Sequence, residues 1–110
     1  MKARYVQRGE SIDFTPTSDV AAGDIIKVGS LVGVAKLDIR AGELGALALC
    51  GVYEIATGGT TVEAGAVVFV NPATGKVCAE GTSGAVKFGH AVAAAAAADA
   101  LVHVRLEQGL

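Results

Sequence analysis

Large side chains are scarce in this sequence. It contains no tryptophan, and only 5% of its 110 residues are aromatic, although 52% are hydrophobic. The apolar content comes mainly from alanine and valine, accompanied by 15 glycines. Small side chains each bury little area, so a core built from them is thin in a single copy of the chain. This imbalance predicts a homo-oligomer in which some apolar surface is buried between copies.

Cysteine and histidine are also sparse, with two of each. Cys50 and Cys78 lie among apolar residues without metal-type spacing, which predicts buried free thiols rather than a disulfide or a metal site. His90 and His103 have no third ligand near them in the sequence, so we interpret them as one structural and one solvated or interface histidine. A histidine with a role would line a symmetry axis or a contact between subunits. We expect no metal and no cofactor.

Long apolar runs and clusters of basic residues are missing. The longest apolar run, residues 91–98, is far shorter than a membrane span, and no apolar signal core follows the first four residues. The net charge is −2 and the nine basic residues are spread along the chain, so no nucleic-acid footprint is visible. We therefore expect a protein made in a reducing cytoplasm, with neither a membrane nor a nucleic acid as its partner.

No catalytic motif is complete. The best match to a phosphate-binding loop runs from Val70 to Val77, and it has valine where both the first glycine and the magnesium-binding hydroxyl are required. No serine lies in a nucleophile elbow, and the acidic residues at 24, 43 and 63 fall on turns, where they are expected to cap backbone amides or face water. The sequence predicts no catalytic residues and no enzyme.

A recurrent turn signal is what the sequence does contain. An Ala-Gly pair precedes an apolar run three times, and a degenerate fourth copy precedes residues 101–106; the four are Ala22-Gly23-Asp24, Ala41-Gly42-Glu43, Ala64-Gly65-Ala66 and Ala97-Ala98-Asp99. Glycine supplies the positive φ of a tight turn, and β-branched residues after it favour a strand. We predict a mainly β fold, a small domain of the barrel or β-clip type with short strands and glycine turns. The alanines at 93–98 allow at most one short helical turn.

The first 19 residues differ from the rest in composition. Ile12 and Phe14 alternate with polar residues and share one face of a short strand, which Pro16 ends. We therefore divide the single domain into an N-terminal arm or edge hairpin, residues 1–19, and a body, residues 20–110.

The chain as a whole resembles a family of small phage and prophage proteins labelled capsid cement, or head-decoration, proteins. The resemblance is collinear and is carried by the opening residues 1–16, Asp19 to Asp24, Val28 to Ala35, Ala41 to Gly45, Gly51 to Glu54, Asn71 to Val77 and Val102 to Leu106. Members have also been labelled recombinases of the RecA kind, but the failed phosphate loop argues against that activity here.

The resemblance implies a β-clip or β-tulip fold and a structural role in the virion. Such proteins are trimers that sit at three-fold positions on the outside of the expanded head, where they clamp neighbouring subunits of the major capsid protein. An extended segment able to add to a neighbour's sheet suits this role. The candidates for capsid contact are Tyr5, Val6, Arg8, Ile12 and Phe14. A β-clip-like module that binds a small ligand or a carbohydrate remains the alternative.

Overall fold

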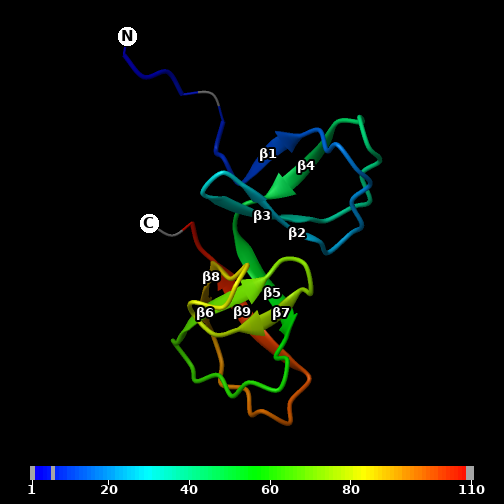
Figure 1. Ribbon diagram of the computed structural model, residues 1–110. Coiled ribbons are helices and arrows are strands. Elements are labelled where there is room, and N and C mark those ends of the chain that lie inside the picture. Colours follow the sequence, from blue (N-terminus) through cyan, green and yellow to red (C-terminus); the bar gives the residue numbers. More distant parts are fainter. Residues whose placement is uncertain (1, 6, 109–110) are drawn as a thin grey trace.

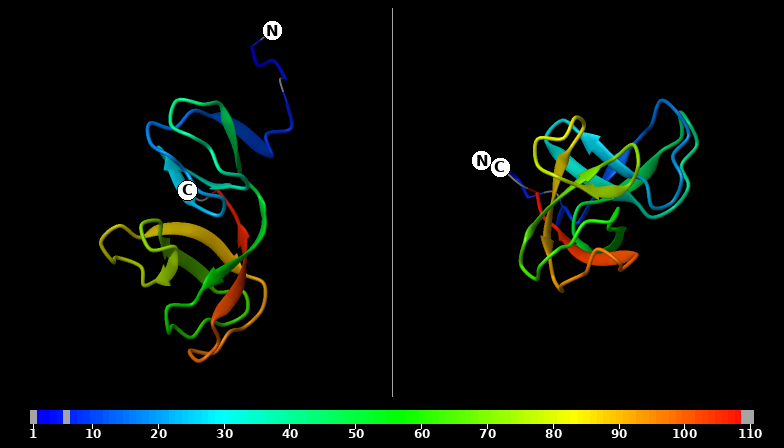
Figure 2. Two further views of the ribbon diagram at one scale, coloured as in Figure 1. Left: turned by 90° about the vertical axis from the view of Figure 1, so that its right-hand side faces the viewer. Right: turned by 60° about the horizontal axis from the view of Figure 1, so that its bottom comes forward.

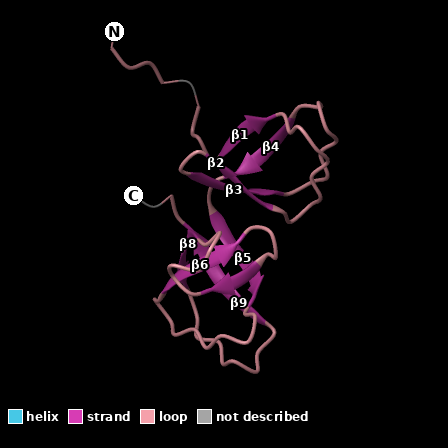
Figure 3. Cartoon of the chain, in the orientation of Figure 1, coloured by secondary structure: helices cyan, strands magenta, loops and turns pink. Residues whose placement is uncertain are grey.

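The computed structural model describes residues 2–5 and 7–108, and these residues form nine strands and no helix (Figures 1 and 3). The predicted mainly β fold is therefore confirmed. The strands are β1 (Ser11–Phe14), β2 (Ile25–Val28), β3 (Leu31–Ala35), β4 (Gly45–Ala48), β5 (Gly51–Ala56), β6 (Val67–Asn71), β7 (Lys76–Cys78), β8 (Val86–Ala91) and β9 (Leu101–Leu106).

The first four strands form one antiparallel sheet in the order β1-β4-β3-β2. β2 and β3 are joined by the turn at Gly29 and Ser30, and Gly29 has a φ of 59°. Residues 1–19, expected to form an arm or edge hairpin, contain β1, which pairs with β4 at one edge of this sheet. β2 forms the other edge.

The last five strands close into a barrel in the order β5-β7-β6-β8-β9, with β9 pairing back onto β5. All neighbours in the barrel are antiparallel except β5 and β7, which meet in parallel at Ala56 and Lys76. The loop whose sequence approaches a phosphate-binding motif is the turn between β6 and β7. It joins two strands rather than a strand and a helix, so it lacks the helix N-terminus at which phosphate-binding loops hold phosphate.

The four recurrent turn signals do form four turns that precede strands. In each, the fourth residue donates its backbone N–H to the carbonyl of the first, and the pairs are Asp24 to Ala21, Glu43 to Arg40, Ala66 to Glu63 and Asp99 to Ala96. The glycines at 23, 42 and 65 have φ values of 91°, 79° and 80°. No described residue other than glycine has a positive φ, so the turn at Ala98 keeps the hydrogen bond with a different backbone conformation.

The turns belong to a structural repeat that relates the sheet to most of the barrel. An isolated bridge joins Val20 to Ile39 in the first half of the chain, and another joins Val62 to Ala95 in the second. β1, β2, β3 and β4 pair with one another in the same pattern as β5, β6, β8 and β9. β7 has no counterpart among the described residues of the first half, where the two-residue turn after β2 leads directly into β3. Ala95 is held in its bridge, which explains why the alanine run forms no helix.

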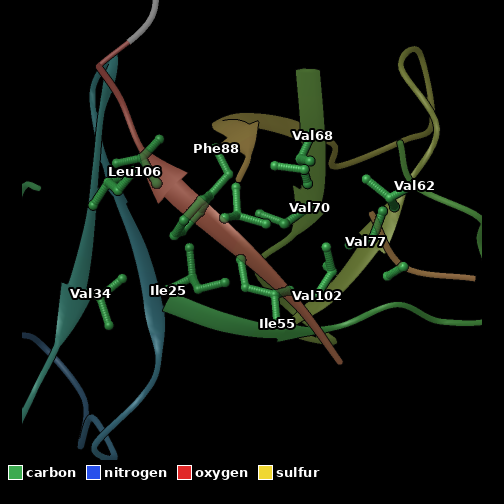
Figure 4. Packing of buried hydrophobic residues seen from close by; sticks show 14 residues of the cluster. Ile25, Val34, Ile55, Val62, Val68, Val70, Val77, Phe88, Val102 and Leu106 are labelled. Atoms are coloured by element: carbon green, nitrogen blue, oxygen red, sulfur yellow. The ribbon is translucent and has the colours of Figure 1, made fainter. Parts of the chain in front are cut away.

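The core joins the two halves of the molecule. Residues of β2 and β3, including Ile25 and Val34, pack in one cluster with barrel residues such as Phe88 and Leu106 (Figure 4). A smaller cluster of Val20, Ala35, Ile39 and Leu47 lies on the opposite face of the four-stranded sheet. The sheet therefore sits on one end of the barrel, and the segment preceding β1 projects away from both (Figure 2).

Candidate docking surfaces

The five candidate contact residues fall into two groups. Tyr5 and Arg8 lie in the segment before β1, where every described residue from 2 to 10 is exposed. Tyr5 is 78% exposed, and Arg8 pairs with the exposed Glu10 at 3.2 Å between Nη2 and Oε1. Val6 lies outside the described residues. The segment thus presents an aromatic ring and a cation on a projecting stretch of backbone.

Ile12 and Phe14 lie instead on β1, in the four-stranded sheet. Both side chains are half-buried and pack against the small cluster formed by Val20, Ala35, Ile39 and Leu47. Their alternation in the sequence correctly predicts that they share a face. Because they are only half covered, each keeps apolar surface at the edge of the sheet.

A second surface, which the sequence did not single out, is the outside of the barrel. The register places Val67, His90, Arg105 and Val52 side by side across β6, β8, β9 and β5. Val67 and Val52 are 47% and 57% exposed, and Val92 and Leu101 at the barrel's end are about half exposed. Spacing within one strand could not reveal this row, because its members come from four segments of the chain.

Both histidines lie on this outer surface and each is paired with a glutamate. His90 Nδ1 is 2.6 Å from Glu107 Oε2, and His103 Nε2 is 3.3 Å from Glu54 Oε1. The hydrogen bond from His90, reinforced by its charge and by nearby Arg105 and Lys87, lowers the pKa of Glu107 below its usual range. Histidine–glutamate contacts on a sheet face supply charge but no third ligand for a metal.

Cys50 and Cys78 are both free thiols, as predicted, but Cys50 is exposed. The prediction that both are buried is therefore wrong for Cys50, and Cys78 is only half-buried. It lies at the β4–β5 junction, beside Gly51 with its φ of 116°, and its carbonyl accepts a hydrogen bond from the Tyr53 hydroxyl at 2.8 Å. Burial of the ring and the neighbouring Cys50 raise the pKa of Tyr53.

An open groove of about 370 Å³ lies along β6 and β7. Its polar groups are the hydroxyls of Thr60 and Thr61 and the carboxylates of Glu63 and Glu80, while Val67 and Phe69 supply its apolar wall. Within residues 2–5 and 7–108, histidine, cysteine and acidic side chains form no group of three or more that could hold a metal ion. The part of the chain that the structure describes has no helix capable of spanning a membrane.

Taken together, these features describe a small all-β protein with a projecting, exposed segment before β1 and exposed apolar side chains on the outside of a barrel. The comparison with protein families agrees with that class. A family described as phage cement protein matches residues 6–106, nearly the whole chain, so the chain belongs to the phage cement protein family. No curated protein matches it. The family is one of structural capsid components, which fits a protein without enzymatic activity.

Proposed function

We propose that the protein is a trimeric cement that sits at three-fold positions on the outside of the expanded phage head. The observation that carries this proposal is the projecting segment before β1, whose described side chains are all exposed. An exposed segment of this kind can add as a strand to the edge of a neighbour's sheet. Tyr5, Val6 and Arg8 on the segment, and Ile12 and Phe14 on β1, are the residues proposed to contact the major capsid protein.

The outer surface of the barrel supports the trimer. Val52 and Val67 are exposed at the two ends of a row that has His90 and Arg105 between them. Burying such a row against a second copy removes apolar area from water, and a ring of three closes it in all copies. Three copies of a weak contact also gain avidity on a symmetric head.

Binding to heads tests the proposal. Purified protein is mixed with expanded heads that lack it, and the bound fraction is measured by sedimentation. The test variant carries Tyr5→Ser and Arg8→Ser, which leave β1 intact, whereas deletion of residues 1–16 would also remove an edge strand. Leu37→Ser, at a residue that is 77% exposed between β3 and β4, is the control. We expect the double variant to bind about tenfold more weakly; equal binding by both would reject the segment as a capsid contact.

The solution mass tests the oligomer separately. Light scattering of the free protein is expected to give three times the mass of the chain. Val52→Glu should reduce that mass, because it places a carboxylate at an apolar position of each proposed contact between copies. A wild-type protein that remains a single copy at the highest soluble concentration would contradict the trimer and leave the capsid contact to be judged by sedimentation.

A further inference from the structure

The structural repeat shows where the four-stranded sheet is incomplete. In the barrel, β7 lies between β5 and β6 and pairs with both. The counterparts of these two strands are β1 and β2. Among the described residues, β1 pairs only with β4 and β2 only with β3. The position that β7 fills in the second half is therefore open in the first.

Side-chain burial marks the same opening. The register makes Phe14, Ile26 and Val28 the counterparts of the barrel residues Ile55, Val68 and Val70. These three barrel residues are 5%, 2% and 0% exposed, in one cluster with Val77 of β7 (Figure 4).

Their counterparts in the sheet are less covered. Phe14 and Ile26 are half-buried, and Val28 is 37% exposed. Apolar side chains in equivalent positions thus lose their cover where no β7 is present.

The backbone of β2 is oriented to receive a strand. The Ala35 N–H donates to the Asp24 carbonyl at 3.0 Å, so these two residues form a hydrogen-bonded pair. Hydrogen-bonded pairs alternate along an antiparallel ladder, so Ile26 faces β3 and Lys27 faces the open edge. The barrel counterpart of Lys27 is Phe69, which pairs with Cys78 of β7. The backbone N–H and carbonyl of Lys27 therefore point to the open edge, at the position where Phe69 in the barrel pairs with β7.

We infer that an extended segment of the capsid protein inserts between β1 and β2 and closes the four-stranded sheet into a second barrel. β7 serves as the template for this segment: it runs antiparallel to β6 and parallel to β5, and it turns the single β-branched side chain of Val77 inward. A matching segment runs antiparallel to β2 and places one β-branched residue over Phe14 and Val28.

The inference rests on the proposed function and is continuous with it. The projecting segment proposed to contact the capsid leads directly into β1, so a capsid strand held by Tyr5 and Arg8 reaches the open edge of the same sheet. The occupant supplies backbone hydrogen bonds and one apolar side chain, which is the chemistry of strand addition. A second copy of this chain could offer a strand as well, and the experiment separates the two sources.

A proline at Lys27 tests the backbone pairing. Proline removes the outward N–H and leaves the hydrogen bonds between β2 and β3 in place, a position at which edge strands tolerate it. Lys27→Ala is the matched control, because it removes the same charge and keeps the N–H. We expect Lys27→Pro to bind heads about tenfold more weakly than Lys27→Ala. Thermal melts and solution mass of both variants are measured alongside.

Each outcome decides the inference. Equal binding by the two variants overturns it. A change in the solution mass of Lys27→Pro, with unchanged binding per copy, assigns the opening to a second copy and also overturns it. Wild-type protein that fails to bind heads overturns the proposed function itself, and the inference falls with it.

A second pair of variants tests the apolar side in case the proline prevents folding. Val28→Glu puts a carboxylate beneath the inserted strand, at a residue exposed enough to accept it in the free protein. Leu37→Glu adds the same charge at a residue that is 77% exposed and lies outside the open edge. We expect only Val28→Glu to weaken binding to heads, and equal binding by both would overturn the inference.

Discussion

The backbone carbonyl of Arg105 occupies the space that a Cβ atom at Gly89 would need. Gly89 pairs with Val68 on one side and Leu106 on the other, so β6, β8 and β9 meet at this residue. Its φ is not in the left-handed region. Glycine is required here because the strands approach closely, and the register next to it shifts between Val68 and Phe69.

Gly89→Ala is therefore expected to destabilise the protein by about 3 kcal/mol or more, because the obstructing atom is backbone and cannot move aside like a side chain. Gly65→Ala is the control: nothing lies within 4 Å of its added Cβ, and only its positive φ of 80° is strained, a cost of about 1 kcal/mol. Chemical denaturation of both variants measures the difference. Equal destabilisation would show that β8 and β9 separate easily.

Glycine spacing allowed the strands and turns to be predicted, but it could not distinguish these two roles. Gly65 follows alanine in a repeated turn signal, so its turn is readable from the sequence. Gly89 sits within an apolar strand. Glycine is required there because of the close approach of β9, which comes later in the chain. The same limit applies to the barrel closure, because the pairing of β5 with β9 joins segments about 50 residues apart. Local spacing carries no information on such pairs.

The candidate contact residues likewise divide into a feature that local spacing predicts and one that depends on distant segments. Alternation placed Ile12 and Phe14 on one face, and the structure puts both on the half-covered side of β1. The opening beside them could not be predicted, because it is found only by comparing the strand pairing in two halves of the chain that have different sequences. The turn signals hinted at a repeat, but the equivalence of Val28 with Val70 follows only from the strand register.

The fourth turn differs from the other three because its backbone does not need glycine. Ala98 does not have a positive φ, so Ala98→Gly relieves no strain and adds freedom to the unfolded chain. We expect it to lower the free energy of unfolding by about 0.5–1 kcal/mol. Denaturation curves beside those of Gly65→Ala provide the check. A stabilising Ala98→Gly would mean that alanine is held there in a left-handed conformation.

The carboxylate of Asp99 also supports this turn, because its Oδ2 accepts the backbone N–H of Ala96 at 2.8 Å. Asp24 makes the equivalent contact with Ala21 at 3.0 Å. We expect Asp99→Ala to cost about 1 kcal/mol of stability, as loss of a capping side chain does, with Asp99→Asn retaining part of it. Thermal melts decide this. Glu43→Ala is the control, because Glu43 occupies the equivalent position of its turn and its side chain makes no hydrogen bond among the described residues. Equal melting temperatures for Asp99→Ala and wild type would contradict the capping role.

The contact between His90 and Glu107 makes stability depend on pH at the acidic end. A carboxyl whose pKa is lowered on folding stabilises the protein above its unfolded pKa, and this contribution is lost as the pH falls through the folded pKa. The difference in melting temperature between wild type and Glu107→Gln should therefore shrink between about pH 5 and about pH 2. Glu54→Gln, whose histidine contact is longer, should show a smaller difference throughout. A gap that stays constant down to the lowest pH would refute the coupling.

Gln108 fastens the chain after β9 to the four-stranded sheet. Its side-chain carbonyl accepts the Val32 N–H at 2.9 Å, and its amide donates to the carbonyls of Val32 and Leu49 at 2.8 and 3.0 Å. Because this side chain bonds to strand β3 and to the residue after β4, Gln108→Ala should cost about 1–2 kcal/mol. Gln108→Glu should cost at least as much, since a carboxylate cannot donate to the two carbonyls. Gln7→Ala, in the projecting segment, is the control and should leave the unfolding curve unchanged. A Gln108→Ala curve that overlays the Gln7→Ala curve would show that the hydrogen bonds of Gln108 are not needed to hold the sheet on the barrel.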